Sequence, residues 1–410
     1  MSKLLKNVSI YHLIILSFFL RLISYHFFRD IELVNEWGKI IHNKETTGVF
    51  GFYIATGEFT VNQKLAEIGD RVLPTIFMPP LYYYFIYALK LLSSEVLNLI
   101  NLIIFIQILL SLISIFIFFK ILKKFASEKL SIIFTLIFAF FPIYVIAPVQ
   151  ISSITLQIFL LLNFLYFLIK FHLKKKIIYL FFFSLFSGLL ILIRGEFFLF
   201  YFFTLFYFFI FFERNIKIPI ISFFVTILLI SPYIYRNYVL FENLTLTKSF
   251  GYNLLKGNNP SLIVEGDTLF IETNYPREKL KIKTNTKFEI ELDNFYKNEA
   301  VEIIKEDPKK YIKFYFKKVI SFLFFDANSS YPNYYNFFHI VPKFILSITT
   351  FVGALVGLRF KGFQQFFSLY YFTNILLFSL FFILPRYSLI LLPIQLLISL
   401  NLVKFLFRKL

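Results

Sequence analysis

The sequence predicts an all-α polytopic membrane protein, on the basis of its composition and the length of its apolar runs. Of the 410 residues, 58% are hydrophobic, with 62 Phe and 26 Tyr, and the mean hydropathy is +0.74. A soluble domain of this length cannot bury so much apolar surface, because exposed surface grows too quickly with size. The apolar residues fall in runs of roughly 17–25, the length of helix that crosses a bilayer. Lipid is therefore the expected solvent for most of the chain.

About ten of these runs qualify as transmembrane helices. The first is too long for a signal-peptide core and lacks a small-residue cleavage site, so we expect it to be a retained span. The predicted spans are 8–28, 97–119, 130–148, 152–171, 177–193, 195–212, 218–234, 340–358, 364–384 and 387–407.

The charges predict how these spans are oriented. A formal net charge of +18 would suggest a nucleic-acid partner in a soluble protein. Here 17 of the 42 cations cluster in short gaps between spans and at the two termini, where the only acids are Glu128 and Glu213, so these places account for +15 of the +18. Such an excess is typical of cytoplasmic loops. We therefore expect no nucleic-acid partner, cytoplasmic termini, and two extracytoplasmic loops at 29–78 and 235–310. The cations are Lys3, Lys6, Lys120, Lys123, Lys124, Lys129, Lys170, Lys174, Lys175, Lys176, Arg214, Lys217, Arg359, Lys361, Lys404, Arg408 and Lys409.

Two shorter apolar runs do not fit as crossings. Counting 80–93 as a span would place the cluster from Lys120 to Lys129 outside the cell. The run 311–325 carries Lys313, Lys317 and Lys318, which lie along one side of a helix. We expect both runs to form helices in the membrane interface, with their apolar faces toward the lipid.

The chain divides into three parts by the same reasoning. An N-terminal transmembrane module, an extracytoplasmic segment with its interfacial helix, and C-terminal spans are expected at 1–234, 235–325 and 326–410. The extracytoplasmic segment holds a Gly/Asn/Pro-rich stretch, a β-like run and an amphipathic helix that Pro308 ends. Their expected bounds are 251–260, 261–273 and about 286–306.

Three carboxylates directly after the first span are the first candidates for catalysis. Asp30, Glu32 and Glu36 lie close together, beside Trp37. Such carboxylates repel one another unless a cation or a hydroxyl donor makes use of them. One reading is a general base with a metal ligand nearby. The other is a solvated helix start, where the helix dipole favours carboxylates. Composition alone gives the two readings equal weight.

Several cations at the outer boundary are candidates for binding an anion. Arg194 lies beside Glu196 between two spans, and Arg386 lies between two others. Charges at this depth are costly unless they are paired or functional, and an arginine there suits an anionic headgroup. A local ion pair and a snorkelling arginine are equally good explanations. Arg236 and Lys256 flank a Gly/Asn-rich stretch whose amides can bind phosphate, although an ordinary surface turn is the favoured alternative.

Other chemistry has little support in the sequence. There are no cysteines, which excludes disulfides and Cys-ligated metals. The five histidines are scattered, and the sequence contains no phosphate-binding Walker loop, dinucleotide fingerprint or Ser/His/Asp elbow.

Four separated segments together resemble the GT-C superfamily of integral-membrane glycosyltransferases. The branch they resemble most holds the protein O-mannosyltransferases and the bacterial lipid A aminoarabinose transferases. The most specific of the four is the Arg-Asn-Tyr to Gly-Asn-Asn-Pro stretch. The segments are Asp30 to Trp37, Phe77 to Tyr82, Arg194 to Glu196, and Pro232 to Pro260.

The resemblance implies an inverting transfer of a sugar from a polyprenyl-phosphate donor to an extracytoplasmic lipid, glycan or protein. It implies a GT-C-like bundle in a membrane of the cell envelope, the bacterial inner membrane. It also implies an essential acid early in the first outer loop, with Asp30 the first choice and Glu32 and Glu36 its rivals. The sequence has Met78 where the family often has a charged residue before Pro-Pro. The resemblance leaves the cofactor open between none and a divalent metal ion.

The remaining implied site residues fall into two groups. The cations for the donor phosphate are Arg71, Arg194, Arg236, Lys256 and Arg386. The residues expected to shape the substrate loops are Trp37, Pro79, Pro80, Tyr82, Glu196, Asn237, Asn258 and Asn259.

Two rival functions stay open. A flippase or transporter of lipid-linked sugars would want polar groups in mid-span and repeat symmetry, whereas these spans are mainly Phe, Leu and Ile. An O-antigen polymerase or ligase would share the lipid donor and a large outer loop.

Overall fold

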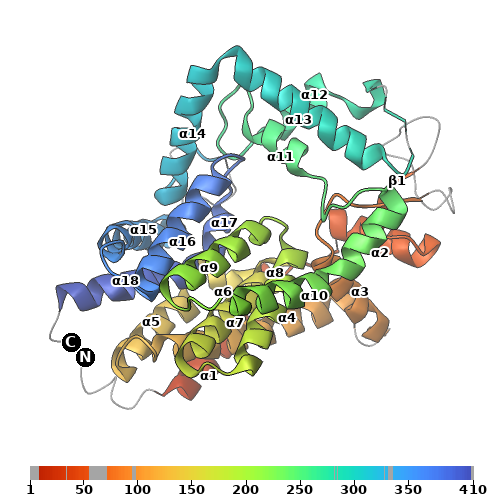
Figure 1. Ribbon diagram of the computed structural model, residues 1–410. Coiled ribbons are helices and arrows are strands. Elements are labelled where there is room, and N and C mark those ends of the chain that lie inside the picture. The colour runs from red at the N-terminus through yellow and green to blue at the C-terminus, as the bar shows by residue number, and fades with distance from the viewer. Residues whose placement is uncertain are drawn as a thin grey trace.

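The computed structural model shows a bundle of apolar helices with a smaller helical layer over one end (Figure 1). It describes residues 9–33, 35–54, 72–94, 98–280, 282–283, 285–326, 328–330 and 336–407. Apolar helices make up most of the chain. Neighbouring ones pack side by side, as α7 (Ile154–Lys174) does with α8 (Ile177–Ile193), and α15 (Phe337–Gly357) with α18 (Leu392–Leu406). The prediction of a largely α-helical integral membrane protein is confirmed.

The membrane helices fall into three groups by length. Among the described residues, five are long and apolar enough to cross a bilayer: α1 (Ile10–Phe28), α4 (Leu99–Leu122), α7 (Ile154–Lys174), α10 (Lys217–Phe241) and α15 (Phe337–Gly357). A sixth span forms if α5 (Glu128–Phe140) is joined across a 64° bend to α6 (Pro142–Ile146) and the 3₁₀-helix η4 (Ala147–Val149). The shorter helices of the bundle are α3 (Leu81–Leu92), α8 (Ile177–Ile193), α9 (Phe197–Phe211), α16 (Phe363–Phe378), α17 (Pro385–Ile390) and α18 (Leu392–Leu406).

Each of the ten predicted spans therefore contains a helix, while the exact number of crossings stays a prediction. The two runs predicted to lie in the interface are also helical, as α3 and as α14 (Pro308–Leu323). Their position in the interface stays a prediction, as do the three-part boundaries.

The layer above the bundle is built from the two long polar stretches. The first contributes α2 (Asn35–Thr47) and two antiparallel strands, β1 (Gly51–Ile54) and β2 (Val72–Pro74). The second contributes α11 (Phe250–Gly257), α12 (Thr268–Asn274), the 3₁₀-helix η5 (Arg277–Lys279) and α13 (Phe288–Glu306). The predicted amphipathic helix is confirmed as α13, and Pro308 follows it as the first residue of α14.

Two expectations for this layer, a turn at 251–260 and a β-like run at 261–273, are wrong. Most of the first stretch is the helix α11, and the second ends in the helix α12. The Asp267 side chain accepts a hydrogen bond from the Phe270 backbone N–H and so begins α12. Leu255 and Ile271 then pack with α13 in a second apolar core. These contacts with a distant helix outweigh the local preference for turn and strand.

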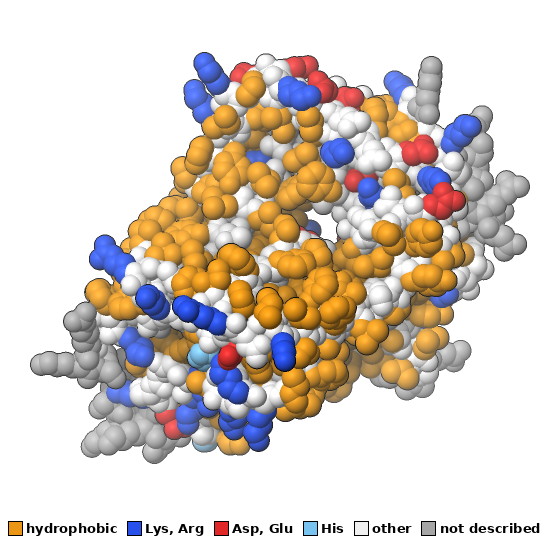
Figure 2. Space-filling model, viewed as in Figure 1, with side chains coloured by type: hydrophobic (Ala, Val, Ile, Leu, Met, Phe, Trp, Pro, Cys, Tyr) orange, Lys and Arg blue, Asp and Glu red, His pale blue; other side chains and the backbone are white. Residues whose placement is uncertain are grey.

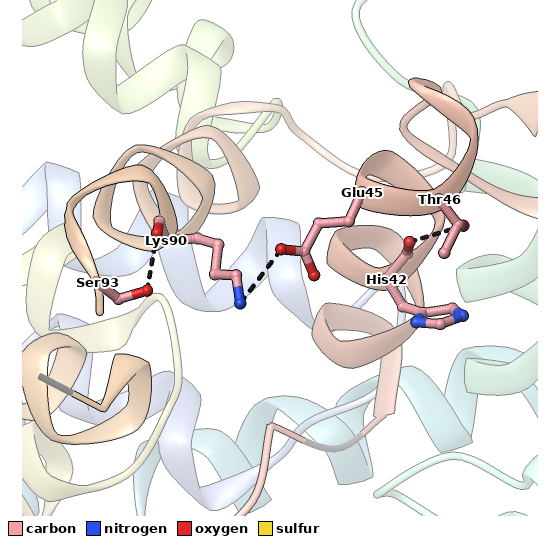
Figure 3. Close-up of polar contacts among 5 residues, drawn as sticks. All are labelled: His42, Glu45, Thr46, Lys90 and Ser93. Carbon is pink, nitrogen blue, oxygen red and sulfur yellow. Dashed lines mark hydrogen bonds and ion pairs between the residues drawn. The ribbon is translucent and has the colours of Figure 1, made fainter. Parts of the chain in front are cut away.

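The first outer stretch is joined to the bundle where α2 packs on α3. Lys90 on α3 forms an ion pair of 3.2 Å with Glu45 on α2, as Figure 3 shows. The Trp37 and Tyr82 rings meet edge to face, with centroids 4.8 Å apart. This second contact is at the end of α2 near the candidate site.

The basic loops gather at one end of the bundle. Lys175 after α7 pairs with Glu213 after α9, and Lys404 on α18 donates to the Phe125 carbonyl after α4. The Phe363 ring, at the start of α16, lies 5.7 Å from the Phe125 ring. The end of α18 lies on this side, at the lower left of Figure 1, and Lys and Arg side chains line the lower edge in Figure 2. Helices that start here, such as α8 and α10, end at the opposite side of the bundle.

Candidate active site

A cavity of about 1290 Å³ lies at the end of the bundle away from the basic loops. Its wall comes from the ends of α1 and α8, the starts of α2, α3, α7 and α9, the helix α11, and the turn between α16 and α17. Figure 2 shows a hollow between the outer layer and the apolar bundle. The predicted site residues that line the cavity are Asp30, Glu32, Glu36, Trp37, Pro79, Tyr82, Arg194, Glu196, Lys256 and Arg386.

Asp30 is the carboxylate that the structure holds in place. It lies just beyond the end of α1 and is half-buried. Its backbone N–H donates to the Val149 carbonyl at 3.2 Å, and its Oδ2 accepts from the Ile151 backbone N–H at 2.7 Å. Glu32 and Glu36 also line the cavity, but their side chains are exposed. The structure therefore distinguishes Asp30 by the fixed orientation of its carboxylate.

The backbone that holds Asp30 is itself fixed from the bundle core. Gln107 on α4 donates through Nε2 to the carbonyls of Pro148 and Gln150, at 3.0 and 2.8 Å. Its Oε1 accepts a hydrogen bond of 3.0 Å from the Tyr82 hydroxyl. The carbonyls at the end of η4, beyond the break after α5, are thus bonded within the protein, as burial in a membrane requires.

A buried arginine lies beside the same break. Arg21 on α1 is fully buried, and it donates to the Ser111 hydroxyl at 2.6 Å and the Ala139 carbonyl at 3.4 Å. Its guanidinium also lies 5.3 Å from the centre of the Tyr144 ring. The guanidinium thus contacts three other helices, α4, α5 and α6, at the bend that leads to the Asp30 site.

Cations form the other side of the cavity. Arg194 pairs with Glu196 at 2.9 Å and lies over the Tyr387 ring at 5.1 Å. Lys256 lies over the Phe382 ring at 4.7 Å. Burial, and then the charge of Arg386, lower the pKa of the Lys256 ammonium.

Lys256 and Arg386 are therefore close enough to repel each other. Within the described ranges neither forms an ion pair with a carboxylate. Glu272 and Asp267 attract Lys256 from a greater distance and offset the lowering of its pKa only in part. Two neighbouring cations without an ion-pair partner on the wall of a cavity are suited to a bound anion.

Two further cations, Arg277 and Lys39, line the cavity and were not predicted. Both lie in polar stretches of the sequence, where a charged residue is unremarkable. A charged residue indicates a functional site in a sequence when it interrupts a run of apolar residues, as Arg194 and Arg386 do.

Arg236 and Asn237 do not line the cavity. The Arg236 guanidinium donates to the Thr75 carbonyl at 2.9 Å and to the Asn237 Oδ1 at 2.8 Å. The Asn237 amide in turn donates to the Thr245 carbonyl at 2.8 Å. These bonds hold the segment that leads to Pro79, so the residues support the wall of the site from behind.

Asn258 and Asn259 are likewise used in bonds to the backbone. The Asn258 amide donates to the Leu380 carbonyl at 3.0 Å, and that of Asn259 to the Lys256 and Ile263 carbonyls, each at 3.0 Å. Pro80 precedes α3 outside the cavity lining. Arg71 lies outside the described residues. The chemical roles of all the predicted site residues stay predictions.

The helix α13 holds two cavity segments through buried carboxylates one turn apart. Glu289 accepts from the Thr75 hydroxyl at 2.9 Å and from the Ile76 backbone N–H at 2.6 Å. Asp293 accepts from the Gly251 backbone N–H at 2.7 Å, at the start of α11. One rigid helix thus positions the segment before Pro79 and the helix that carries Lys256.

Replacement of Glu289 by Gln should make stability less dependent on pH. Burial raises the pKa of Glu289 to about 7 despite the hydrogen bonds it accepts. The folded wild type therefore favours the protonated acid, and its stability should fall as pH rises from the unfolded value of 4.5 through about 7. The loss is roughly 3 kcal/mol at most, at about 1.4 kcal/mol per pKa unit.

Thermal unfolding in detergent, measured across this pH range, checks the prediction. The Gln variant should gain on the wild type as pH rises, while Glu291→Gln, on the exposed side of α13, should not. A gap between wild type and Glu289→Gln that does not change with pH would show that Glu289 does not titrate there.

Within the described ranges, no group of three His, Asp or Glu side chains is arranged to hold a metal ion. The carboxylates of Asp30, Glu32 and Glu36 are oxygen ligands of the kind that hard divalent cations prefer.

The fold, an apolar helical bundle with an outer layer above a cavity, is similar to that of a membrane protein of known structure. No protein-family model matches the sequence, and no curated protein matches it. Among solved structures, the chain is similar to the archaeal oligosaccharyltransferase AglB from Archaeoglobus fulgidus, in complex with an inhibitory peptide and a dolichol-phosphate.

That similarity has a TM-score of 0.53 at 13% sequence identity, and it covers 98% of this chain and 51% of AglB. The chain therefore spans about half the length of that protein. The likeness shows a similar fold, and the GT-C resemblance stays a prediction. The predicted branch, with the O-mannosyltransferases and aminoarabinose transferases, stays a prediction.

Proposed function

We propose that the protein is a glycosyltransferase that moves a sugar or glycan from a polyprenyl-phosphate donor to an acceptor, with inversion at the anomeric carbon. One observation carries the proposal: a single cavity is lined by a backbone-held carboxylate, Asp30, and by two cations without a carboxylate partner, Lys256 and Arg386. The AglB structure holds a dolichol-phosphate, and we propose a lipid phosphate of the same chemical class here.

The residues suit a direct displacement. Asp30 accepts the proton of the acceptor hydroxyl while the hydroxyl oxygen bonds to the anomeric carbon. The bond between that carbon and the phosphate oxygen breaks, and its electron pair stays on the phosphate. Lys256 and Arg386 stabilise the charge that the phosphate gains. The proton on Asp30 then passes to water, which the open cavity admits.

The side of the membrane follows from charge. The cavity lies at the end of the bundle opposite the basic loops, and basic loops are typical of the cytoplasmic side. We therefore place the reaction on the extracytoplasmic face, with both termini in the cytoplasm. A donor that arrives in the membrane already activated needs no nucleotide-binding fold.

A transfer assay tests the proposal directly. Purified protein in detergent is mixed with a panel of polyprenyl-phosphate and polyprenyl-diphosphate sugars and with candidate acceptors, and the products are identified by mass spectrometry. The expected result is release of polyprenyl phosphate with wild type and not with Asp30→Asn. Consumption of diphosphate-linked donors alone would favour a polymerase or ligase, and movement of an uncleaved donor across liposomes would favour a flippase.

A further inference from the structure

The most unusual group outside the proposed reaction is a buried lysine on α14. The Lys318 side chain is 0% exposed, on a helix that is not among those apolar enough to cross the membrane. Its ammonium donates to the Gly257 carbonyl at 3.0 Å, the Asn258 Oδ1 at 3.1 Å and the Phe381 carbonyl at 2.7 Å. A buried ammonium bonded only to uncharged oxygens is costly, and therefore calls for a role.

The three acceptors belong to the two segments that carry the proposed anion site. Gly257 and Asn258 end the helix of Lys256, and Phe381 lies in the turn that leads to Arg386. The two segments touch at this point, because a Cβ on Gly257 would lie 2.3 Å from the Phe381 carbonyl carbon. Lys318 therefore bonds both sides of the seam between them.

The number of donors on the amine matters here. A protonated lysine has three N–H donors, one for each of the three acceptors, whereas the neutral amine has two donors and a lone pair. The lone pair would face an oxygen, which is repulsive. Burial lowers the pKa of Lys318 to about 7, so the third donor is removed within an accessible pH range.

The charged groups around Lys318 do not supply a carboxylate partner. Glu265 accepts from Ser329 and Ser330, and Asp267 caps α12, so these acids in the neighbouring loop are bonded elsewhere. Burial alone accounts for its lowered pKa. Other titratable groups also lie on the segments packed around it. They are Lys309, Lys310, Tyr311, Lys313, Tyr315 and Lys317 on α14, Tyr252 and Lys256 on α11, Tyr370 and Tyr371 on α16, and Arg386 and Tyr387 after the turn.

We propose that Lys318 is a positioning residue whose protonated ammonium clasps the end of α11 to the turn between α16 and α17. The clasp sets the spacing of Lys256 and Arg386, and loss of the proton loosens it. The consequence for lipid-phosphate affinity rests on the proposed function, whereas the clasp itself does not. The pH at which the protein works best would then be limited from above by a group outside the cavity.

A distance measurement tests the clasp without reference to activity. The chain has no cysteines, so Thr273→Cys on α12 and Leu376→Cys on α16 introduce a single pair of spin-label sites at exposed positions. In the otherwise wild-type chain, the distance distribution should be narrow below the Lys318 pKa of about 7 and broader above it. Lys318→Met should be broad at both pH values, and Lys313→Met, an exposed lysine of the same helix, should behave as wild type.

Two results would overturn the proposal. One is a wild-type distribution that is the same on both sides of that pH, which needs no folded variant to observe. The other is a Lys318→Met protein that keeps the narrow wild-type distribution.

A binding measurement then separates the clasp from the proposed function. The probe is a short-chain polyprenyl phosphate. The wild type should bind it roughly tenfold more tightly than Lys318→Met below that pH, and the two proteins should bind it equally above that pH. The ionisation of the ligand and of Lys256 is common to both proteins and cancels in this comparison. Labels that respond to pH without any lipid-phosphate binding would leave the clasp standing and reject the proposed function. Lipid-phosphate binding by a protein whose label distances do not respond to pH would reject the clasp and leave the proposed function standing.

Discussion

Replacement of Asp30 by Asn should lower kcat by at least roughly a hundredfold, the contribution typical of a general base. Asn can still accept the hydrogen bond from the Ile151 backbone N–H through its side-chain oxygen, so the local backbone should be preserved. It cannot take a proton from the acceptor. Donor affinity and thermal stability should therefore stay near the wild-type values while turnover is lost.

The matched controls are Glu32→Gln and Glu36→Gln. Both residues line the same cavity, but their side chains are exposed. We expect smaller losses from each, and release of polyprenyl phosphate measures all three variants in one assay. Normal turnover in Asp30→Asn would refute the assignment of the base, and a large loss in Glu32→Gln or Glu36→Gln instead would move the role to that residue.

Removal of the two cations should act on donor binding. Lys256→Met with Arg386→Gln should raise the KM for donor by roughly a hundredfold or more, since hydrogen bonds to charged groups contribute about 1.5–3 kcal/mol each. The two single changes should each weaken binding by less than the pair. They also remove the mutual repulsion that lowers the pKa of Lys256, so the two effects should not be additive.

Salt provides an independent check on the same cations. The affinity of wild type for a short-chain polyprenyl phosphate should fall as salt is added, because screening weakens the attraction, and the double variant should be less sensitive. Lys309→Gln, an exposed residue of α14, serves as a control for the loss of one positive charge. An unchanged dependence on donor concentration in the double variant would remove these residues from the phosphate site.

Prediction from sequence worked for features that depend on a sharp change in polarity between neighbouring residues. The membrane helices follow from runs of apolar residues, and their expected orientation follows from the charges between them. Asp30, Arg194 and Arg386 stand out because they are charged at the ends of apolar runs, and the structure brings all three to one cavity. Arg277 lies in a polar stretch, where its charge does not distinguish it from its neighbours.

Prediction was weaker where a side chain's use depends on a distant segment. The sequence marks Arg236 and Asn258 as polar residues in unusual motifs. It cannot show that the first bonds to Thr75 and the second to Leu380, far away in the chain. The same limit explains α12, whose β-like pattern is overridden by packing against α13.

In the proposed reaction, the position of Asp30 just beyond the end of α1 fixes the depth at which the acceptor hydroxyl loses its proton. Asp30 is tied to the protein backbone on both sides of Gln150, through its own N–H to Val149 and through its carboxylate to Ile151, so its height relative to the helix bundle does not vary with the size of the substrate. In the proposed transfer, the carbon that reacts is therefore the anomeric carbon attached to the lipid phosphate, regardless of how many sugars are linked beyond it. Such an enzyme should not measure the length of the glycan it transfers, and a single sugar and a long chain should react at the same point.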